Sequence, residues 1–348
     1  MKINGELFKL IRISRDISQA DIASILNIKQ PIVSDIENTG ECSQELLYKI
    51  SQVLRYTPKF FLKEPLVKDT NLILYRKKLT IPKKLLNSID ARLDIFLNYQ
   101  LPELFKQKIN VISMPSKINQ LIIKLNSFST IEEKTSYIRE TFNIKMQVNN
   151  LVELIESLGI IIIYFNFPTD KIDGFSTVLN GKFVIIVNKM FPIDRLRFTL
   201  AHELGHICLN HLSKASEIMS EDCEKEANQF ASELLIPSNK IKPLLKDLTI
   251  TKLFDLKRTW KVSVGALVKK ATELNMVKNS SSLYVQLART GCTNKNEPDI
   301  INEKEYPSSL KKLIENYKEQ NQKTDFNVVH EAFGYMDQSE YLLLSSTK

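Results

Sequence analysis

Two histidines one helical turn apart are the residues best placed to do chemistry. They lie in the segment His202-Glu203-Leu204-Gly205-His206. On a helix, side chains at i and i+4 project from one face, so two imidazole nitrogens can grip one zinc ion. The carboxylate of Glu203 can then take a proton from water instead of ligating the metal. The alternative is a buried helix with two hydrogen-bonded core histidines.

The flanking residues predict that a buried helix carries this motif. The residues next to it are uncharged, and Asp194 is expected to cap the start of the helix. The apolar positions keep a helical period at Leu196, Leu200, Leu204 and Ile207.

A hydrolytic zinc site also needs a third protein ligand and one open position. A second helix is predicted over residues 224–235, and Glu224 lies on its apolar, inward face. We expect Glu224 to be the third ligand and Asn228, one turn later, to hydrogen-bond a ligating imidazole. Glu226 is rotated by about 200° from Glu224 on an ideal helix, so it is expected to face solvent.

Two longer segments contain these residues. They are Arg195-Leu-Arg-Phe-Thr-Leu-Ala-His-Glu-Leu-Gly-His206 and Glu224-Lys-Glu-Ala-Asn-Gln-Phe-Ala-Ser-Glu-Leu-Leu-Ile-Pro237. With Asn188 and residues 262–267, they make residues 150–277 resemble the ImmA/IrrE family of metallopeptidases. The resemblance implies a gluzincin-like zinc site made of two histidines and a glutamate. It also implies cleavage of a repressor in response to stress or mobile-element signals.

The start of the chain predicts a helix-turn-helix. Ser18 and Asp21 form a capping box before a short helix that ends at Leu26. Asn27 tolerates the left-handed turn that follows, and Pro31 lies in the opening turn of a second helix over residues 30–38. Residues 1–63 resemble the XRE, or Cro/C1-type, repressor domain.

This second resemblance implies which residues contact double-stranded operator DNA. Gln30 can pair with adenine and Gln19 can steady a backbone contact. Two departures stand out, because Asn27 replaces the usual glycine and Asp35 brings a negative charge towards DNA. A helix-turn-helix retained for dimerisation or protein contact is the alternative. The DNA-binding residues that the resemblance implies are Gln19, Lys29, Gln30, Pro31, Ser34 and Asp35.

Length and charge suggest several parts. The 348 residues carry a net charge of +8, and residues 66–125 hold eleven Lys or Arg against four Asp or Glu. This basic excess, which includes Arg76-Lys77-Lys78 and Lys83-Lys84, can touch DNA phosphates or simply coat exposed helices. We predict a helix-turn-helix domain at 1–65, a basic helical linker at 66–148 divided by Pro102 and Pro115, a zinc peptidase domain at 149–280 and an appendage of unassigned role at 281–348.

Four well-separated cysteines and the lack of an apolar leader predict a cytoplasmic protein without a membrane contact. Residues 159–165 are rich in β-branched side chains and predict a strand. Asn180-Gly181 predicts a hairpin over residues 174–187, whose arms can hold a substrate backbone. The fold class is therefore α+β, with a helical N-terminal domain and a zincin-like domain containing a small sheet. Tyr164 and His211 are oxyanion candidates by proximity alone.

The sequence predicts a cytoplasmic regulator that binds operator DNA and is a zinc endopeptidase. The expected substrate is a repressor or a toxin-like partner protein, and a homodimer is compatible with the fold. In the alternative, a DNA-binding regulator or antitoxin-like protein uses its peptidase-like domain to sense a ligand or partner without cleaving it.

Overall fold

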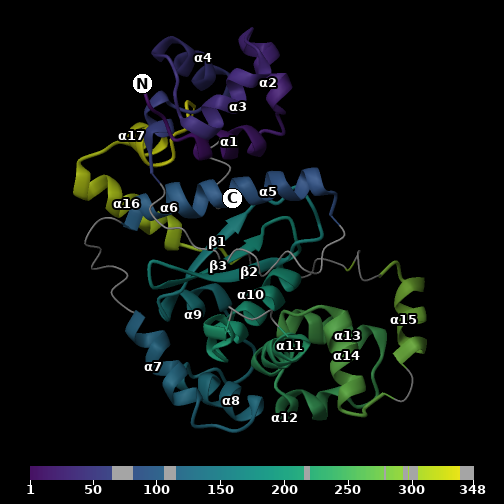
Figure 1. The fold of residues 1–348 in the computed structure, drawn as a ribbon. Helices are drawn as coiled ribbons and strands as arrows, with labels where there is room; N and C mark the ends of the chain where they lie inside the picture. Colours follow the sequence, from purple (N-terminus) through teal and green to yellow (C-terminus); the bar gives the residue numbers. More distant parts are fainter. Residues whose placement is uncertain are drawn as a thin grey trace.

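The computed structural model describes residues 1–64, 81–105, 115–214, 220–277, 280–292, 297 and 305–337. The N-terminal helices lie at one end of the molecule, followed by the long helix α5 and then the sheet (Figure 1). Further helices cover the far side of the sheet. This arrangement is the α+β fold that the sequence predicts.

The predicted helix-turn-helix is present. The Ser18 hydroxyl accepts a hydrogen bond from the backbone N–H of Asp21, whose carboxylate accepts from the Ser18 N–H. Asn27 adopts the left-handed conformation with φ 54°, and Pro31 lies in the first turn of the next helix. The N-terminal elements are α1 (Gly5–Ser14), α2 (Gln19–Leu26), α3 (Gln30–Thr39), α4 (Gln44–Leu54) and a 3-10 turn (Pro58–Leu62).

The described part of the middle region, residues 81–105 and 115–148, is mainly helical, but Pro102 does not break it. A π-helical turn precedes this proline, and the backbone continues through it without interruption from Lys83 to Phe105. The wider turn is one way for a helix to accommodate the lost hydrogen bond of a proline. The elements are α5 (Lys83–Ile95), the π turn (Phe96–Gln100), α6 (Leu101–Phe105), α7 (Pro115–Leu125), α8 (Ile131–Thr141) and α9 (Leu151–Ser157).

The described sheet has the strand order β1-β3-β2. Strand β1 (Ile161–Phe165) is parallel to β3 (Lys182–Asn188), and β2 (Gly174–Leu179) is antiparallel to it. Asn180 and Gly181 both have positive φ, which confirms the predicted hairpin turn. Because side chains alternate along a strand, Ile161 and Ile163 face one hydrophobic cluster and Ile162 faces another.

The motif helix α10 (Ile193–Cys208) packs closely on α11 (Glu221–Leu235). A Cβ atom at Gly205 would lie only 3.1–3.2 Å from the Phe230 ring, so a glycine permits this approach. The expectation that Asp194 caps α10 is wrong. Pro192 occupies the cap position, and the buried Asp194 side chain instead pairs with Lys257.

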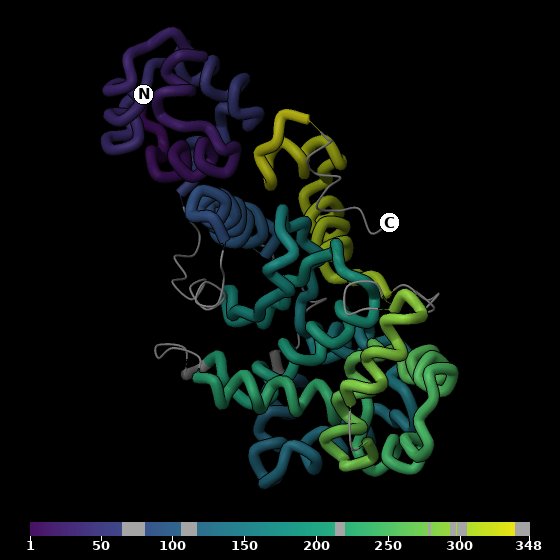
Figure 2. Tube along the Cα trace, turned by 90° about the vertical axis from the view of Figure 1, so that its right-hand side faces the viewer, coloured from purple at the N-terminus to yellow at the C-terminus, as the bar shows by residue number. Residues whose placement is uncertain are grey.

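The last two helices, α16 (Ser309–Asn321) and α17 (Asp325–Asn327), connect the N-terminal helices with the sheet (Figures 1 and 2). Helix α16 packs against β1 and α6. Thr57 donates its N–H to Gly334, and the Gln100 amide donates to Phe333. The elements after α11 are α12 (Ser238–Ile241), a 3-10 turn (Lys242–Leu245), α13 (Ile250–Trp260), α14 (Val264–Glu273), α15 (Ser280–Arg289), α16 (Ser309–Asn321), α17 (Asp325–Asn327) and a π turn (Val328–Ala332).

One hydrophobic cluster therefore includes residues from four parts of the molecule: Phe8 of α1, Leu93 of α5, Ile163 of the sheet and Leu313 of α16. The described part of the appendage is helical, and the apolar residues 341–344 lie outside the described residues. None of the described helices combines the length and the hydrophobicity that crossing a bilayer demands.

Candidate metal centre and nucleic-acid interface

The structure brings the predicted ligand trio together. The Nε2 atoms of His202 and His206 lie 3.0 Å apart. One carboxylate oxygen of Glu224 is 3.7 Å from His202 Nε2, and the other is 3.8 Å from His206 Nε2. One ligand atom from each residue lies within 4.8 Å of the others. Two consecutive turns of α10 and the first turn of α11 therefore converge on one point.

The chemistry of this donor set fits a divalent cation. Asn228 Oδ1 lies 3.1 Å from His202 Nδ1 and can only accept, so a neutral His202 carries its proton on Nδ1. The lone pair of His202 is then on Nε2, the atom that lies next to His206 Nε2 and the Glu224 carboxylate. Two imidazole nitrogens and one carboxylate are a ligand set that zinc takes in hydrolytic sites. Asn228 lies where the sequence predicts it.

Glu203 lies on the same helix, buried beside the trio. Its carboxylate accepts a 2.7 Å hydrogen bond from the Ser176 hydroxyl of β2. Burial raises the pKa of Glu203 to about 7, against the opposing hydrogen bond from Ser176, and the charge of Glu224 adds to the rise. A carboxyl with a pKa near neutrality can both take and return a proton.

Two polar contacts beside this cluster, both made by His211, were not predicted from the sequence. The Nδ1 atoms of His206 and His211 are 3.0 Å apart, and His211 Nε2 lies 3.0 Å from a carboxylate oxygen of Glu226. Glu226 does point away from the metal trio, as predicted, but it contacts a histidine. The Tyr164 hydroxyl donates to the Glu305 carbonyl and is not part of the trio.

The helix-turn-helix carries its own polar network. Arg12 Nε donates to Glu37, whose other oxygen accepts from the Gln19 amide at 2.7 Å. Gln19 Oε1 in turn accepts from Gln30 Nε2 at 2.7 Å. The network begins in the core, where Arg12 is buried, and ends at the exposed start of α3.

The other residues implied as DNA contacts share this surface. Lys29, Pro31 and Asp35 are exposed, and Ser34 is half-buried. The basic residues 76–78 lie outside the described residues. Lys83 and Lys84 are exposed at the start of α5, so their ammonium groups are accessible to a phosphate backbone.

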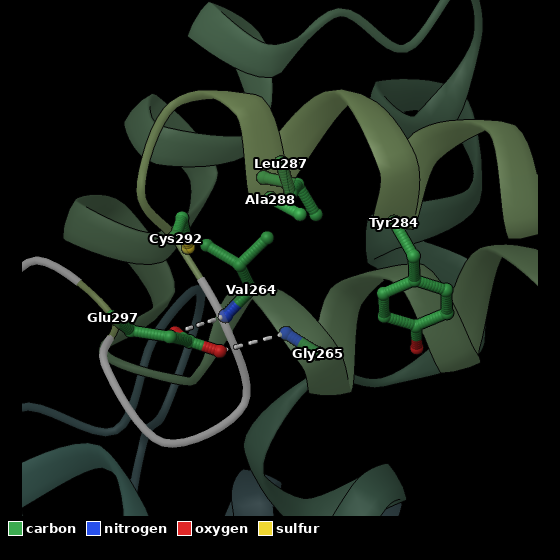
Figure 3. Close-up of a pocket in the computed structure, with 7 residues that line it drawn as sticks. All are labelled: Val264, Gly265, Tyr284, Leu287, Ala288, Cys292 and Glu297. Carbon is green, nitrogen blue, oxygen red and sulfur yellow. Dashed lines mark hydrogen bonds between the residues drawn. The ribbon is translucent and has the colours of Figure 1, made fainter.

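A cavity of about 240 Å³ lies elsewhere, between α14 and α15 (Figure 3). The carboxylate of Glu297 accepts from the backbone N–H groups of Val264 and Gly265. It also pairs with the buried Lys257. The chain's own carboxylate thus occupies the positive end of α14. The lining residues are Val264, Gly265, Tyr284, Leu287, Ala288, Cys292 and Glu297, none of them in the ligand trio.

Comparison with protein families confirms both resemblances. Residues 155–272 match the IrrE N-terminal-like domain of the M78 peptidases, and residues 8–61 match a helix-turn-helix family. No curated protein matches the chain. The first match includes every residue of the trio, and the second includes Gln19 and the whole of α3. The chain therefore joins an XRE-type helix-turn-helix domain, which supports DNA binding, to a metallopeptidase-type domain of the ImmA/IrrE kind.

Proposed function

We propose that this protein is a cytoplasmic regulator that binds operator DNA and hydrolyses a peptide bond in a partner protein. The observation that carries the hydrolytic part is the convergence of His202 Nε2, His206 Nε2 and the Glu224 carboxylate beside a buried Glu203. In this proposal the trio holds zinc. A bound zinc ion supplies a Lewis acid that acidifies water and polarises the scissile carbonyl.

Glu203 performs the proton transfers in this proposal. Its carboxylate takes a proton from the attacking water and later gives it to the leaving amine. The Ser176 hydroxyl holds one carboxylate oxygen, which limits the rotation of the side chain. Because Ser176 belongs to β2, this hydrogen bond also fixes the position of the Glu203 carboxylate relative to that strand.

Strand β2 is the proposed docking edge for the substrate. Of the two hairpin arms that the sequence offers, β3 lies in the middle of the described sheet and β2 at its edge. An extended peptide can add to an edge strand through backbone hydrogen bonds. Strand β1 is the other edge, but α16 packs against it. A substrate on β2 would run past Ser176 and therefore close to Glu203.

The test compares the wild type with Glu203→Gln, which is nearly isosteric and leaves the trio intact. We expect metal analysis to find one zinc ion per chain in both proteins. New protein N-termini, the products of cleavage, should appear in cells that express the wild type and not in cells that express the variant. Loss of the general base is expected to slow cleavage by about 10²- to 10⁴-fold. Identical sets of new N-termini in both strains would refute the peptidase proposal, and a trio that binds no zinc would refute the metal proposal.

A second function is favoured by the shared hydrophobic cluster. Because this cluster joins α1, α5, the sheet and α16, a change at the sheet can reach the DNA-binding helices. A regulator of this kind would sense a ligand or partner and cleave nothing. In that case Glu203→Gln would repress as the wild type does and zinc removal would change operator affinity, both measurable by reporter and gel-shift assays.

The operator contact is proposed through the exposed start of α3, with Gln30 reading a base and Gln19 supporting it. A homodimer and a toxin-like or repressor-like substrate remain part of the proposal. All four cysteines are free thiols, which suits a reducing compartment.

A further inference from the structure

A line of three side chains runs from the molecular surface to the proposed metal position. It begins at Glu226 on α11 and passes through His211, in the short 3-10 turn after α10 (His211–Lys214), to His206. Both steps measure 3.0 Å. The Glu226 side chain is 54% exposed, whereas those of His211 and His206 are each 2% exposed. The line thus connects solvent with a buried ligand.

The proton positions along this line follow from its outer end. An ionised carboxylate only accepts, so His211 carries a proton on Nε2. A neutral His211 then has a lone pair on Nδ1, which accepts from His206 Nδ1–H. His206 is left with an unprotonated Nε2, the atom that faces His202 and Glu224.

The reverse arrangement is less favourable. If His211 Nδ1 donated to His206, His211 would carry a proton on both nitrogens, which places a positive charge in a buried position. A neutral His206 would then keep its proton on Nε2 and could not bind a cation. The carboxylate of Glu226 therefore favours the tautomer that metal binding requires.

The two imidazoles of the trio are supported unequally. His202 depends on Asn228, whose amide has both a donor and an acceptor end and can present either after a flip. His206 depends on a carboxylate that has no donor. Of the two histidines, His206 is thus the one whose tautomer is fixed, because the carboxylate at the outer end of its hydrogen-bonded series can only accept.

We propose that His211 and Glu226 are positioning residues that hold His206 in its metal-binding tautomer and orientation. This inference rests on the part of the proposed function that makes His206 a zinc ligand. It does not rest on proteolysis, so zinc binding alone can test it. The competing role is structural, in which the pair merely joins the turn after α10 to α11.

The experiment measures the affinity of the full-length protein for Zn²⁺ by competition with a chromophoric chelator, together with the visible spectrum of the Co²⁺-loaded protein. Glu226→Ala is the leading variant because it removes the acceptor for His211, and its half-exposed side chain can change without disturbing the core. Glu221→Ala, at an exposed acid on the same helix, is the matched control for lost charge. We expect Glu226→Ala to weaken Zn²⁺ binding by about tenfold, the lower end for outer contacts of metal ligands, and Glu221→Ala to leave it unchanged.

His211→Leu and His211→Gln separate positioning from packing. Leu removes the acceptor, and we expect affinity to fall by about 10- to 100-fold with an altered Co²⁺ spectrum. Gln can return an acceptor oxygen to His206, so it is expected to restore most of the affinity and the spectrum. Equal affinities for Glu226→Ala and Glu221→Ala would overturn the proposal even if His211→Leu fails to fold.

The outcomes also separate this inference from the proposed function. A wild type that binds no Zn²⁺ would overturn both. A wild type that binds Zn²⁺ but cleaves no protein would remove the peptidase and leave the positioning test valid.

Discussion

The helix-turn-helix and the metal region contain the same kind of hydrogen-bonded series of side chains, but the buried and exposed ends of the series are exchanged. In each, a carboxylate that only accepts hydrogen bonds orients a chain of side chains. Glu37 orients Gln19 and through it Gln30, as Glu226 orients His211 and His206. The Glu37 side chain is 4% exposed and Gln30 is exposed, whereas Glu226 is 54% exposed and His206 is buried.

This difference follows from what each region has to meet. A DNA groove approaches from outside, so the last side chain of the network must lie at the surface. A metal-binding nitrogen works best where water is excluded, so the network must end inside. The comparison implies that removal of the buried acid Glu37 lowers the free energy of unfolding strongly. Removal of the exposed acid Glu226 should change it little.

The largest effect is expected from a direct ligand of the proposed metal. His206→Ala removes one of three donors, and we expect the Zn²⁺ affinity to fall by more than the ~100-fold limit for outer contacts. Equilibrium dialysis with metal analysis measures this. His330→Ala, at the only histidine outside the 202–211 segment, is the control and should bind as the wild type does. Equal binding by the two variants would place the metal elsewhere.

The next largest effect is expected from removal of the buried acid in the N-terminal domain. Glu37→Ala leaves the buried Arg12 guanidinium without its carboxylate partner, which is expected to lower the free energy of unfolding by about 3 kcal/mol. Urea denaturation of the full chain, followed by circular dichroism, measures the loss. The exposed Glu41→Ala is the control. The contrast between the two regions breaks down if Glu226→Ala destabilises the protein as much as Glu37→Ala does.

The sequence predicted best what a single helix or turn decides. His202 and His206 share a face because of helical spacing, Glu224 lies on the inward face of α11, and Asn180-Gly181 forms the hairpin turn. These features need only local geometry, and tertiary packing then brought the trio together.

The contacts that the sequence did not predict join distant segments. His211 meets Glu226 because the chain folds back after α10, and no periodic pattern encodes that approach. The buried Arg197 pairs with Glu305, 108 positions later. Asp194 has a residue type that is common at helix caps and lies in the first turn of α10, yet its carboxylate pairs with the buried Lys257 of α13.

A smaller effect is expected at the exposed end of the DNA-facing network. Gln30 donates one amide N–H to Gln19, and its other N–H and its oxygen are the pair of groups that adenine requires. Gln30→Ala is expected to cost about 1–3 kcal/mol of preference for one base. Selection from a random duplex library, compared between wild type and variant, measures this preference. Gln19→Ala should weaken the preference at the same base position to a lesser extent. A change at a different base position would contradict the proposed orientation of Gln30.

The smallest expected effect concerns the lysines at the start of α5. This helix packs on α1, and the Ser88 hydroxyl donates to the Ser14 carbonyl just before α2. Hydrogen bonds from Ser18 lower the pKa of the Asp21 carboxyl, and the nearby charge of Lys84 adds to this. Lys84 lies one helical turn before Ser88 on α5, on the part of the helix that contacts the segment before α2. The first helix of a helix-turn-helix crosses the DNA backbone.

Lys83→Ala with Lys84→Ala should therefore weaken binding to all duplexes alike and reduce the slope of log affinity against log salt by about 2, one for each phosphate contact. Fluorescence anisotropy with a random-sequence duplex measures the slope. The exposed pair Lys311 and Lys312 on α16 is the control; an equal slope change there would mean that general charge, and not the position of α5, sets the affinity.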